Sequence, residues 1–382
     1  MRKTVVTSLV ALALAAVALL SMADTLGEPV RWTPDGLFYQ ARTLELQGTD
    51  REQALAETFQ GPQGAAMRAV DPERSGDPEW VSYNAQFYER RLIVPAAAAA
   101  LEPVAGDRAL LDLSVAGYVA AVLAIFALLL LRFSLPIAAA VSLATIALPA
   151  LSNHSGFPLT DSWGLALQTA ALGCGILALE RGRRWVIGWA IALLVLAFTR
   201  DSALILVLAA AWLALTQRSR VSYWLLGTSV AASASVALLF AMPMRELLAM
   251  MLNDAQPDPG ASWISILERY PAAIVDLLQA DGGYVRNGAW GSALYLLAGL
   301  GLLFLLGRGP RASAGTSLLK AGALAGAAYV VAVPIFSAFR LELVLVPMAA
   351  YGLAFGFEWI AVRAALPSLA RPALPVSGRA SS

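Results

Sequence analysis

The residues best suited to chemistry in this chain are a few carboxylates and arginines that stand beside long apolar segments. Asp35 lies near the start of a polar loop, in the run Trp32-Thr33-Pro34-Asp35-Gly36-Leu37-Phe38-Tyr39-Gln40-Ala41-Arg42. A carboxylate in such a place can take the proton of an attacking hydroxyl group. Arginines can bind a phosphate through two parallel hydrogen bonds and stabilise it as a leaving group. The residue types therefore predict a base next to an anion site.

Further ionisable residues stand between the later apolar segments, namely Asp112, His154, Asp161, Arg200, Asp201, Arg340 and Glu342. Ionisable groups at membrane depth are functional candidates, because burying a charge in lipid is costly. Each has a structural alternative as well. Arg200 and Asp201 can form an interfacial pair, as can Arg340 and Glu342, while Asp161 and His154 can be ordinary loop polarity. Asp35 can simply compensate the charge of a helix N-terminus.

The elements that position these residues are membrane-spanning helices. The chain is 59% hydrophobic and 14% charged, whereas a soluble protein is about 25% charged. The bilayer core needs roughly 20 apolar residues per helix, and uncharged runs near that length recur. We predict ten spans, at Thr4–Ala23, Leu113–Leu131, Phe133–Thr160, Ser162–Leu179, Trp185–Thr199, Ser202–Gln217, Val221–Met244, Asn287–Gly307, Ala321–Phe339 and Leu343–Phe357. The Leu/Ala/Val-rich runs read as helices rather than barrel strands, so the fold class is an all-α integral membrane protein.

Three of these spans have unusual lengths. The Phe133–Thr160 run is too long for one helix, and Pro149 with the polar residues after Leu151 predicts that it ends near Leu151. Trp185–Thr199 has only 15 uncharged residues, about 22 Å at 1.5 Å per residue. The next run is similar, and neither crosses a ~30 Å core unaided. The Arg200-Asp201 pair between them is therefore expected at or below the outer membrane surface.

Basic residues set the expected orientation. With the N-terminus inside, the inner segments carry Arg2, Lys3, Arg132, Arg181, Arg183, Arg184, Arg218, Arg220, Arg308, Arg311, Lys320, Arg363, Arg371 and Arg379, against one clear acid, Glu180. Both termini are then cytoplasmic. The net charge of +1 and the short basic clusters give no indication of nucleic-acid binding.

The chain divides into four predicted segments. Residues 1–23 are a first transmembrane anchor, with a cleaved secretory signal as the alternative. Residues 24–108 form an extracytoplasmic loop that holds 14 of the 26 acidic residues, and it stays outside in either case. Residues 109–362 form the transmembrane bundle, with a second outer segment at 244–286. Residues 363–382, rich in Pro and Ser, are expected to be a disordered cytoplasmic tail.

The long loop has local signals of its own. Thr33 followed by Pro34 predicts an N-cap and a helix over about Pro34–Gln47, which we expect to lie along the outer interface with Phe38 and Tyr39 in the headgroup zone. Thr49 to Glu52 matches a capping box that opens a second helix. Residues 61–78 read as irregular. Elsewhere, the single Cys174 excludes a disulfide and the single His154 excludes a multi-histidine metal site.

Taken together, these pieces resemble the GT-C superfamily of polytopic glycosyltransferases, which use polyprenyl-phosphate-linked sugars. The nearest likeness is to the bacterial relatives of the protein O-mannosyltransferases and the lipid A sugar transferases. The resemblance covers about residues 1–362 as architecture. Its motifs are Pro34–Arg42, Phe87-Tyr88-Glu89-Arg90-Arg91-Leu92-Ile93-Val94-Pro95, Leu159-Thr160-Asp161, Thr199-Arg200-Asp201-Ser202-Ala203-Leu204 and Phe339-Arg340-Leu341-Glu342.

The resemblance implies an inverting sugar transfer at the extracytoplasmic face of the bacterial cytoplasmic membrane. Asp35 would be the catalytic base, and Arg200 and Arg340 would bind the lipid phosphate. The other implied substrate-binding residues are Asp161, His154, Asp201, Glu342, Tyr39 and Arg42. The partners would be a polyprenyl-phosphate sugar donor, a lipid, glycan or protein acceptor, and membrane lipids. Many members have two adjacent acids, but Gly36 stands in the second place here, which weakens the inference of a metal or a second carboxylate. The resemblance implies no definite cofactor and leaves a divalent cation open.

Other classes of function fit parts of the pattern. A transporter or flippase would place charges near the bilayer midplane and break helices in two related halves, whereas these charges are expected at the outer edge and no halves match. A glycan polymerase or ligase would use similar lipid-linked substrates on another fold. A non-enzymatic member of the same architecture is kept open by the missing second acid.

Overall fold

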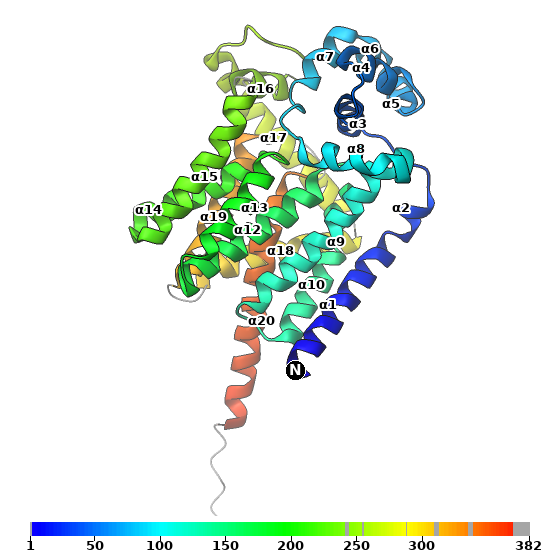
Figure 1. Ribbon diagram of the computed structural model, residues 1–382. Helices are drawn as coiled ribbons and strands as arrows, with labels where there is room; N and C mark the ends of the chain where they lie inside the picture. Colours follow the sequence, from blue (N-terminus) through cyan, green and yellow to red (C-terminus); the bar gives the residue numbers. More distant parts are fainter. Residues whose placement is uncertain are drawn as a thin grey trace, which may run out of the picture.

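The computed structural model describes residues 2–240, 244–253, 256–287, 289–308, 313–334 and 339–369. Within these ranges all regular structure is helical and no strand occurs, which confirms the predicted all-α class. The chain forms a helical bundle that carries a polar cap at one end (Figure 1). The N-terminus and the end of α20 lie at the opposite end of the bundle from the cap.

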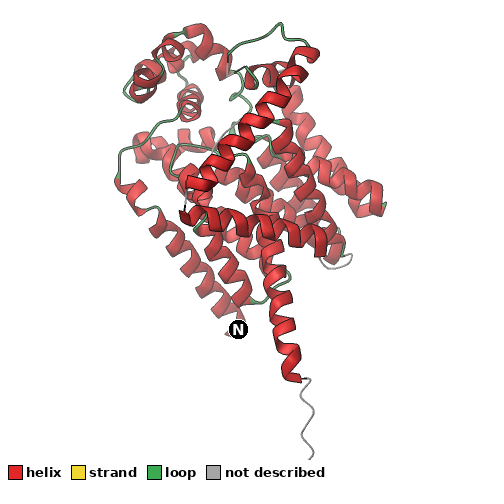
Figure 2. Ribbon diagram, turned by 180° about the vertical axis from the view of Figure 1, so that it is seen from behind, coloured by secondary structure: helices red, strands yellow, loops and turns green. Residues whose placement is uncertain are grey.

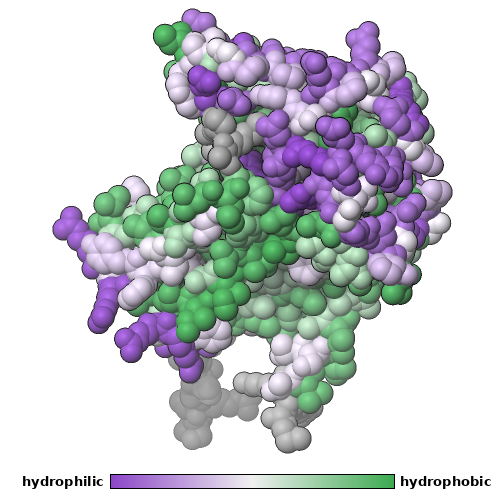
Figure 3. All heavy atoms as spheres, turned by 45° about the horizontal axis from the view of Figure 1, so that its top comes forward, coloured by the Kyte–Doolittle hydropathy of each residue, from purple (hydrophilic) through white to green (hydrophobic). Residues whose placement is uncertain are grey.

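The bundle consists of long apolar helices and a few shorter ones. Six described stretches are long and apolar enough to cross a membrane: Thr4–Ser21, Ile93–Leu130, Asp161–Arg181, Arg220–Leu239, Ala314–Ala332 and Glu342–Arg363. The helices α10 (Leu135–Ile146) and α11 (Pro149–Ser155) form a pair bent by 59°, and three shorter helices are also apolar. A band of hydrophobic surface covers the bundle below the hydrophilic cap (Figure 3). The chain is thus built as a membrane protein.

The bundle helices not yet bounded are α1 (Arg2–Ser21), α9 (Ala109–Leu130), α12 (Asp161–Arg181), α13 (Trp185–Ala197), α14 (Ala203–Gln217), α15 (Arg220–Leu239), α18 (Ala289–Arg308), α19 (Ala314–Ala332) and α20 (Val346–Leu369). Helix α12 is central, since it packs on α9, α13 and α19. Its first turn meets the cap, as described below. Figure 2 shows the same bundle from behind, with helices throughout.

The cap is the segment from α2 to η1 that joins α1 to α9. Its elements are α2 (Ala23–Gly27), α3 (Pro34–Leu46), α4 (Arg51–Gln60), α5 (Ala65–Val70), α6 (Pro72–Gly76), α7 (Pro78–Ala85), α8 (Ile93–Ala105) and the 3-10 turn η1 (Gly106–Arg108). Helix α8 lies across the end of α9, between the rest of the cap and the bundle (Figure 1). A second polar segment supplies α16 (Met244–Met251) and α17 (Trp263–Asn287).

Helix α3 begins where the sequence predicts, but its apolar face is buried within the cap and does not face lipid headgroups. The Thr33 side chain accepts a hydrogen bond from the Gly36 amide at 3.1 Å, which confirms the predicted N-cap. Phe38 and Tyr39 are almost fully buried. Phe38 packs in a small core with residues of α4 and α7, such as Phe59. The apolar stripe was taken for a membrane face, yet partners within the cap cover it.

Two other predictions about the cap are wrong. The N-cap of α4 is Asp50, which accepts from the Glu52 amide, rather than Thr49. The stretch from 61 to 78 is not irregular, because it contains α5 and α6. Asp71 caps α6 ahead of Pro72. An Asp-Pro pair breaks a preceding helix but also begins the next one well.

Some bundle boundaries differ from the predicted spans as well. The third run breaks after Ile146, ahead of Leu151. Helix α19 begins at Ala314, ahead of the predicted start at Ala321, and the Ser313 side chain caps it. The single charge of Lys320 does not end the helix, because a long lysine side chain can extend toward water. Helix α20 continues to Leu369, into the segment predicted to be a disordered tail. The rest of that tail lies outside the described residues.

Candidate active site

Asp35 stands in the first turn of α3 with both carboxylate oxygens occupied. The Tyr88 hydroxyl donates to Oδ1 at 2.6 Å. Nη1 of Arg340, from the turn ahead of α20, lies 2.5 Å from Oδ2. The side chains of Asp35 and Arg340 are 24% and 17% exposed. One contact therefore joins the cap to the far end of the sequence.

Arg340 also binds a second carboxylate, that of Asp161. Its Nε donates to both oxygens of Asp161 at 2.9 Å. Nη2 of Arg200, from the turn between α13 and α14, lies 2.8 Å from Oδ1 of the same group. Asp161 is the first residue of α12, and its side chain is only 3% exposed. The helix dipole would favour a carboxylate at this N-terminus, so Asp161 serves as the fixed anchor for two arginines.

A second part of the site is built on Asp201. Arg90 and Arg91 of the cap approach one of its oxygens at 2.9 and 3.2 Å. Nη1 of Arg91 donates to the Tyr39 hydroxyl at 2.5 Å, and that hydroxyl lies 3.1 Å from Oγ1 of Thr160. Thr160 precedes Asp161 directly. The two parts thus adjoin, and we call Asp35, Arg90, Arg91, Asp161, Arg200, Asp201 and Arg340 together the ion-pair cluster.

The ion-pair cluster has unused donors. It contains four arginines and three aspartates, so its net charge is 4 − 3 = +1. Four buried guanidinium nitrogens have no hydrogen-bond partner: Arg200 Nη1, Arg340 Nη2, Arg90 Nε and Arg91 Nε. A buried polar group without a partner is costly, and such groups call for an explanation. A bound anion would satisfy both the free donors and the excess positive charge.

Electrostatics at the ion-pair cluster favour the charged form of Asp35 and Asp201. Burial raises the pKa of Asp35, but Arg340, the Tyr88 hydrogen bond and Arg91 outweigh it, so the pKa lies below its ordinary value of 3.8. Burial likewise raises the pKa of Asp201, and Arg90, Arg91 and Arg200 bring it below the ordinary value. Burial and the neighbouring Asp35 raise the pKa of Tyr88 well above 10.0. Tyr88 is thus a protonated donor to an ionised Asp35.

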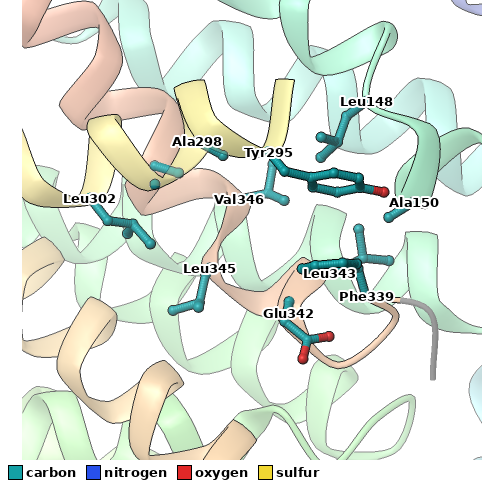
Figure 4. A pocket seen from close by; sticks show the side chains of 12 residues that line it. Leu148, Ala150, Tyr295, Ala298, Leu302, Phe339, Glu342, Leu343, Leu345 and Val346 are labelled. Atoms are coloured by element: carbon teal, nitrogen blue, oxygen red, sulfur yellow. The ribbon is translucent and has the colours of Figure 1, made fainter. Parts of the chain in front are cut away.

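An apolar pocket of about 190 Å³ is lined in part by Phe339, the residue before Arg340. Its wall includes Phe339, Tyr295 of α18 and Val346 of α20. The rings of Phe339 and Tyr295 stack at 4.3 Å, and Figure 4 shows how they face each other in the pocket. A second, smaller cavity shares Leu148 and Val346 with it and continues along α10 and α20. Two apolar pockets with shared lining residues thus lie beside the turn that carries Arg340.

Not all predicted site residues join the ion-pair cluster. Asp35, Asp161, Arg200, Asp201 and Arg340 do, and the Tyr39 hydroxyl is hydrogen-bonded to Arg91 of the cluster. Arg42 instead pairs with Glu45, one turn further along α3. Glu342 lines the apolar pocket and interacts electrostatically with Asp281 of α17. The geometry therefore separates Arg42 and Glu342 from the other candidates.

His154 lies in a different hollow, a cavity of about 460 Å³ lined also by Thr25 and Arg31. It still interacts electrostatically with Asp161. It is therefore a neighbour of the ion-pair cluster rather than a member.

Three members of the site were missed as site residues: Tyr88, Arg90 and Arg91. They belong to the quoted Phe87–Pro95 motif, where two consecutive arginines follow an aromatic pair. The expected depth of a charge in the membrane does not identify these three residues, because they lie in the cap.

Among the described residues, no group of three or more His, Cys, Asp or Glu side chains could hold a metal ion. The carboxylates of the ion-pair cluster are each neutralised by guanidinium groups. The donor set here is thus suited to an anion and not to the divalent cation left open by the sequence.

No protein-family model matches the chain, and no curated protein matches it either. The function must therefore be argued from the site.

Proposed function

We propose that this protein is a membrane glycosyltransferase that moves a sugar from a polyprenyl-phosphate donor to an acceptor hydroxyl, with inversion. The observation that carries the proposal is the position of Arg340. Its guanidinium contacts the carboxylate of Asp35 at 2.5 Å, and the residue before it, Phe339, lines an apolar pocket. A base, free arginine donors and an apolar pocket thus meet at one turn.

The donors of the anion site suit a lipid phosphate, which must widen the cavity of about 10 Å³ that Asp161, Arg200 and Arg340 line. Arg200 Nη1 and Arg340 Nη2 are buried and free to donate, and both guanidinium groups are held by the same carboxylate, Asp161. Arginine binds phosphate in bidentate fashion. Fixed positive groups near a leaving phosphate stabilise the charge that develops on it.

The two apolar pockets suit the first isoprenoid units of a polyprenyl chain. Their lining residues extend from Phe339 along α18 and α20 to residues of α10 such as Val141. A phosphate at Arg340 would place the attached isoprenoid carbons beside Phe339. Apolar burial stabilises binding by roughly 25 cal/mol per Å², so a long chain adds affinity that a free sugar phosphate lacks.

In the proposed reaction Asp35 accepts the proton of the acceptor hydroxyl. The hydroxyl oxygen attacks the anomeric carbon from the face opposite the phosphate. The new glycosidic C–O bond forms while the bond to the phosphate oxygen breaks, and the polyprenyl phosphate leaves with the electron pair. The configuration at that carbon inverts.

The proposed topology has ten spans. They are the six long apolar stretches, the bent pair α10–α11, and the shorter apolar helices α13, α14 and the Gly291–Gly307 part of α18. Both termini would be cytoplasmic, as the basic residues predict. The cap and the ion-pair cluster would then face the extracytoplasmic side of a bacterial cytoplasmic membrane, where a polyprenyl-linked donor and an envelope acceptor can meet.

Replacing Asp35 tests the catalytic assignment. Asp35→Asn keeps the shape but cannot accept a proton, so transfer should fall by at least about 100-fold. The measurement is radiolabel transfer from a panel of polyprenyl-phosphate sugars to the acceptor fraction of the envelope, at matched expression. Asp107→Asn, an exposed change in the same loop, should leave transfer intact. Full activity in Asp35→Asn would remove Asp35 as the base.

The lipid that co-purifies with the protein separates the alternatives. Mass spectrometry of extracted lipid should find a polyprenyl phosphate, and less of this lipid should co-purify with Arg200→Gln. Bound polyprenyl phosphate without any transfer would favour a flippase or a non-enzymatic lipid-binding protein. The absence of polyprenyl phosphate from an active preparation would contradict the donor class.

A further inference from the structure

The structure holds Asp35 in a form that cannot act as a good base. Both of its oxygens are engaged, one by Tyr88 at 2.6 Å and the other by Arg340 at 2.5 Å. Its pKa lies below 3.8, since these partners outweigh the effect of burial. A general base works best when its pKa is near the working pH. The contact with Arg340 must weaken before Asp35 can take a proton.

Arg340 is arranged so that it can release Asp35 without leaving the site. Its Nε is bound to both oxygens of Asp161, which anchors the guanidinium independently of Asp35. Its Nη2 is buried and unpaired, adjacent to the Nη1 that holds Asp35. An anion that took both Nη atoms would form a bidentate pair and would displace only the contact to Asp35.

The turn that carries Arg340 is also tied to the apolar pocket. Phe339 has a φ of +62°, a left-handed conformation that is strained for a bulky residue. Its ring stacks on Tyr295 inside the pocket. A chain that enters the pocket therefore contacts the residue whose backbone leads directly into Arg340.

We propose that Arg340 is a latch on Asp35 that a lipid-linked phosphate opens, with the phosphate taking the Nη atoms and the lipid chain entering beside Phe339. This inference rests on the proposed function, because it names the regulation of the same site. Without donor, Asp35 stays paired and water is not activated. When the donor is bound, the carboxylate is free to accept the proton of the acceptor hydroxyl beside the donor sugar.

Replacing Asp35 by a phosphate on Arg340 changes the pKa of Asp35 in the direction that catalysis requires. Loss of the Arg340 contact removes a group that lowers the pKa of Asp35. A phosphate nearby adds negative charge, which disfavours a second anion. Both changes raise the pKa of Asp35 toward the working pH, while the Tyr88 hydrogen bond still orients the carboxylate.

Carbodiimide labelling of Asp35 tests the latch without measuring transfer. A hydrophobic carbodiimide modifies protonated carboxyl groups, and peptide mass spectrometry reports the modified fraction. The purified full chain is labelled in detergent near pH 6, either alone, with a polyprenyl monophosphate, or with the matching polyprenol. Loss of one charge-assisted hydrogen bond should raise the rate roughly tenfold or more with the phosphate lipid only.

Variants make the test independent of ligand. In Arg340→Gln, Asp35 should be labelled rapidly with no lipid present. In Arg340→Lys it should be labelled at an intermediate rate, because a lysine ammonium lacks the planar set of donors of a guanidinium group. Arg200→Gln should stay slow without lipid, since it leaves the Asp35 contact intact. Arg51→Gln, which removes a cap ion pair with Glu89, should match the wild type.

Two outcomes overturn the latch. One is equal labelling of Asp35 in the wild type and in folded Arg340→Gln or Arg340→Lys without lipid. The other is bound polyprenyl phosphate, shown with radiolabelled lipid, that leaves the labelling rate unchanged. Failure of the wild type to bind any polyprenyl phosphate would instead contradict the proposed function, and the ligand-free comparison of variants would still decide the latch.

Discussion

Asp201 is the residue on which the packing of two cap arginines depends. The Arg90 and Arg91 side chains are 15% and 11% exposed, and their common counter-ion is the Asp201 carboxylate. Removing the carboxylate leaves the two guanidinium charges without a counter-ion where water solvates them poorly. We predict that Asp201→Asn lowers the free energy of unfolding by about 3 kcal/mol. Glu89→Gln, in a more exposed pair with Arg51, should cost about 1 kcal/mol or less.

The pH dependence identifies the cause of that loss. The folded pKa of Asp201 lies below its ordinary value of 3.8, so its contribution is present above about pH 4 and is lost as the pH falls through the folded pKa. Thermal unfolding in detergent should show a difference in stability between wild type and Asp201→Asn that is constant at neutral pH and becomes smaller below about pH 4. A difference that does not change with pH would mean that lost packing, not charge, explains the effect.

At the residue scale, the sequence identifies charges that are rare in an apolar chain. Asp35, Arg200 and Arg340 were selected for that reason, and they lie together in the structure. Tyr88 could not be found this way, because a tyrosine in a polar loop is ordinary until its hydroxyl is seen 2.6 Å from Asp35. The partner of a charge is a tertiary property, and sequence spacing does not contain it.

At the scale of single helices, α12 positions the anion site through a glycine. A Cβ at Gly164, one turn after Asp161, would lie 2.7 Å from Cγ of Arg200. Gly164→Ala should therefore push the Arg200 side chain off Asp161. We predict a loss of polyprenyl-phosphate binding of roughly tenfold, comparable to one weakened charge-assisted hydrogen bond.

The matched control for this change lies on the same helix. A Cβ at Gly173 would meet nothing closer than Leu128 at 4.0 Å, so Gly173→Ala should bind lipid like the wild type. The measurement is binding of radiolabelled polyprenyl phosphate to the purified variants. Equal binding by Gly164→Ala and Gly173→Ala would show that the Arg200 position is not set by this contact.

Helices of the bundle were easier to predict than those of the cap. Long uncharged runs such as 221–239 of α15 leave little choice of structure in lipid, and their positions follow from composition. Cap helices depend on capping residues, and the sequence predicts a loop at Asp71 and Pro72 although these residues begin α6. The apolar face of α3 was assigned to membrane, because the sequence alone does not distinguish a lipid partner from Phe59 of α4.

At the scale of the whole molecule, the two-part plan follows from the distribution of charge, but the junction between the parts does not. The acidic loop and the apolar remainder predict a cap on a bundle. That residues 35 and 340 meet is set by the packing of α12, α19 and α20. The contact between the two ends of the sequence is what turns separate candidate residues into one site.

The proposal requires that this junction face the extracytoplasmic side, and cysteine accessibility tests it. In a Cys174→Ser background, Asp107→Cys sits in η1 at the cap end and Arg183→Cys follows the opposite end of α12, both at exposed positions. Arg181 and Arg184, which remain on either side of the substituted position, should hold that end in the cytoplasm. A membrane-impermeant maleimide should thus label Asp107→Cys in intact cells and Arg183→Cys only after permeabilisation. The reverse pattern would place the ion-pair cluster in the cytoplasm, where an envelope acceptor could not reach Asp35.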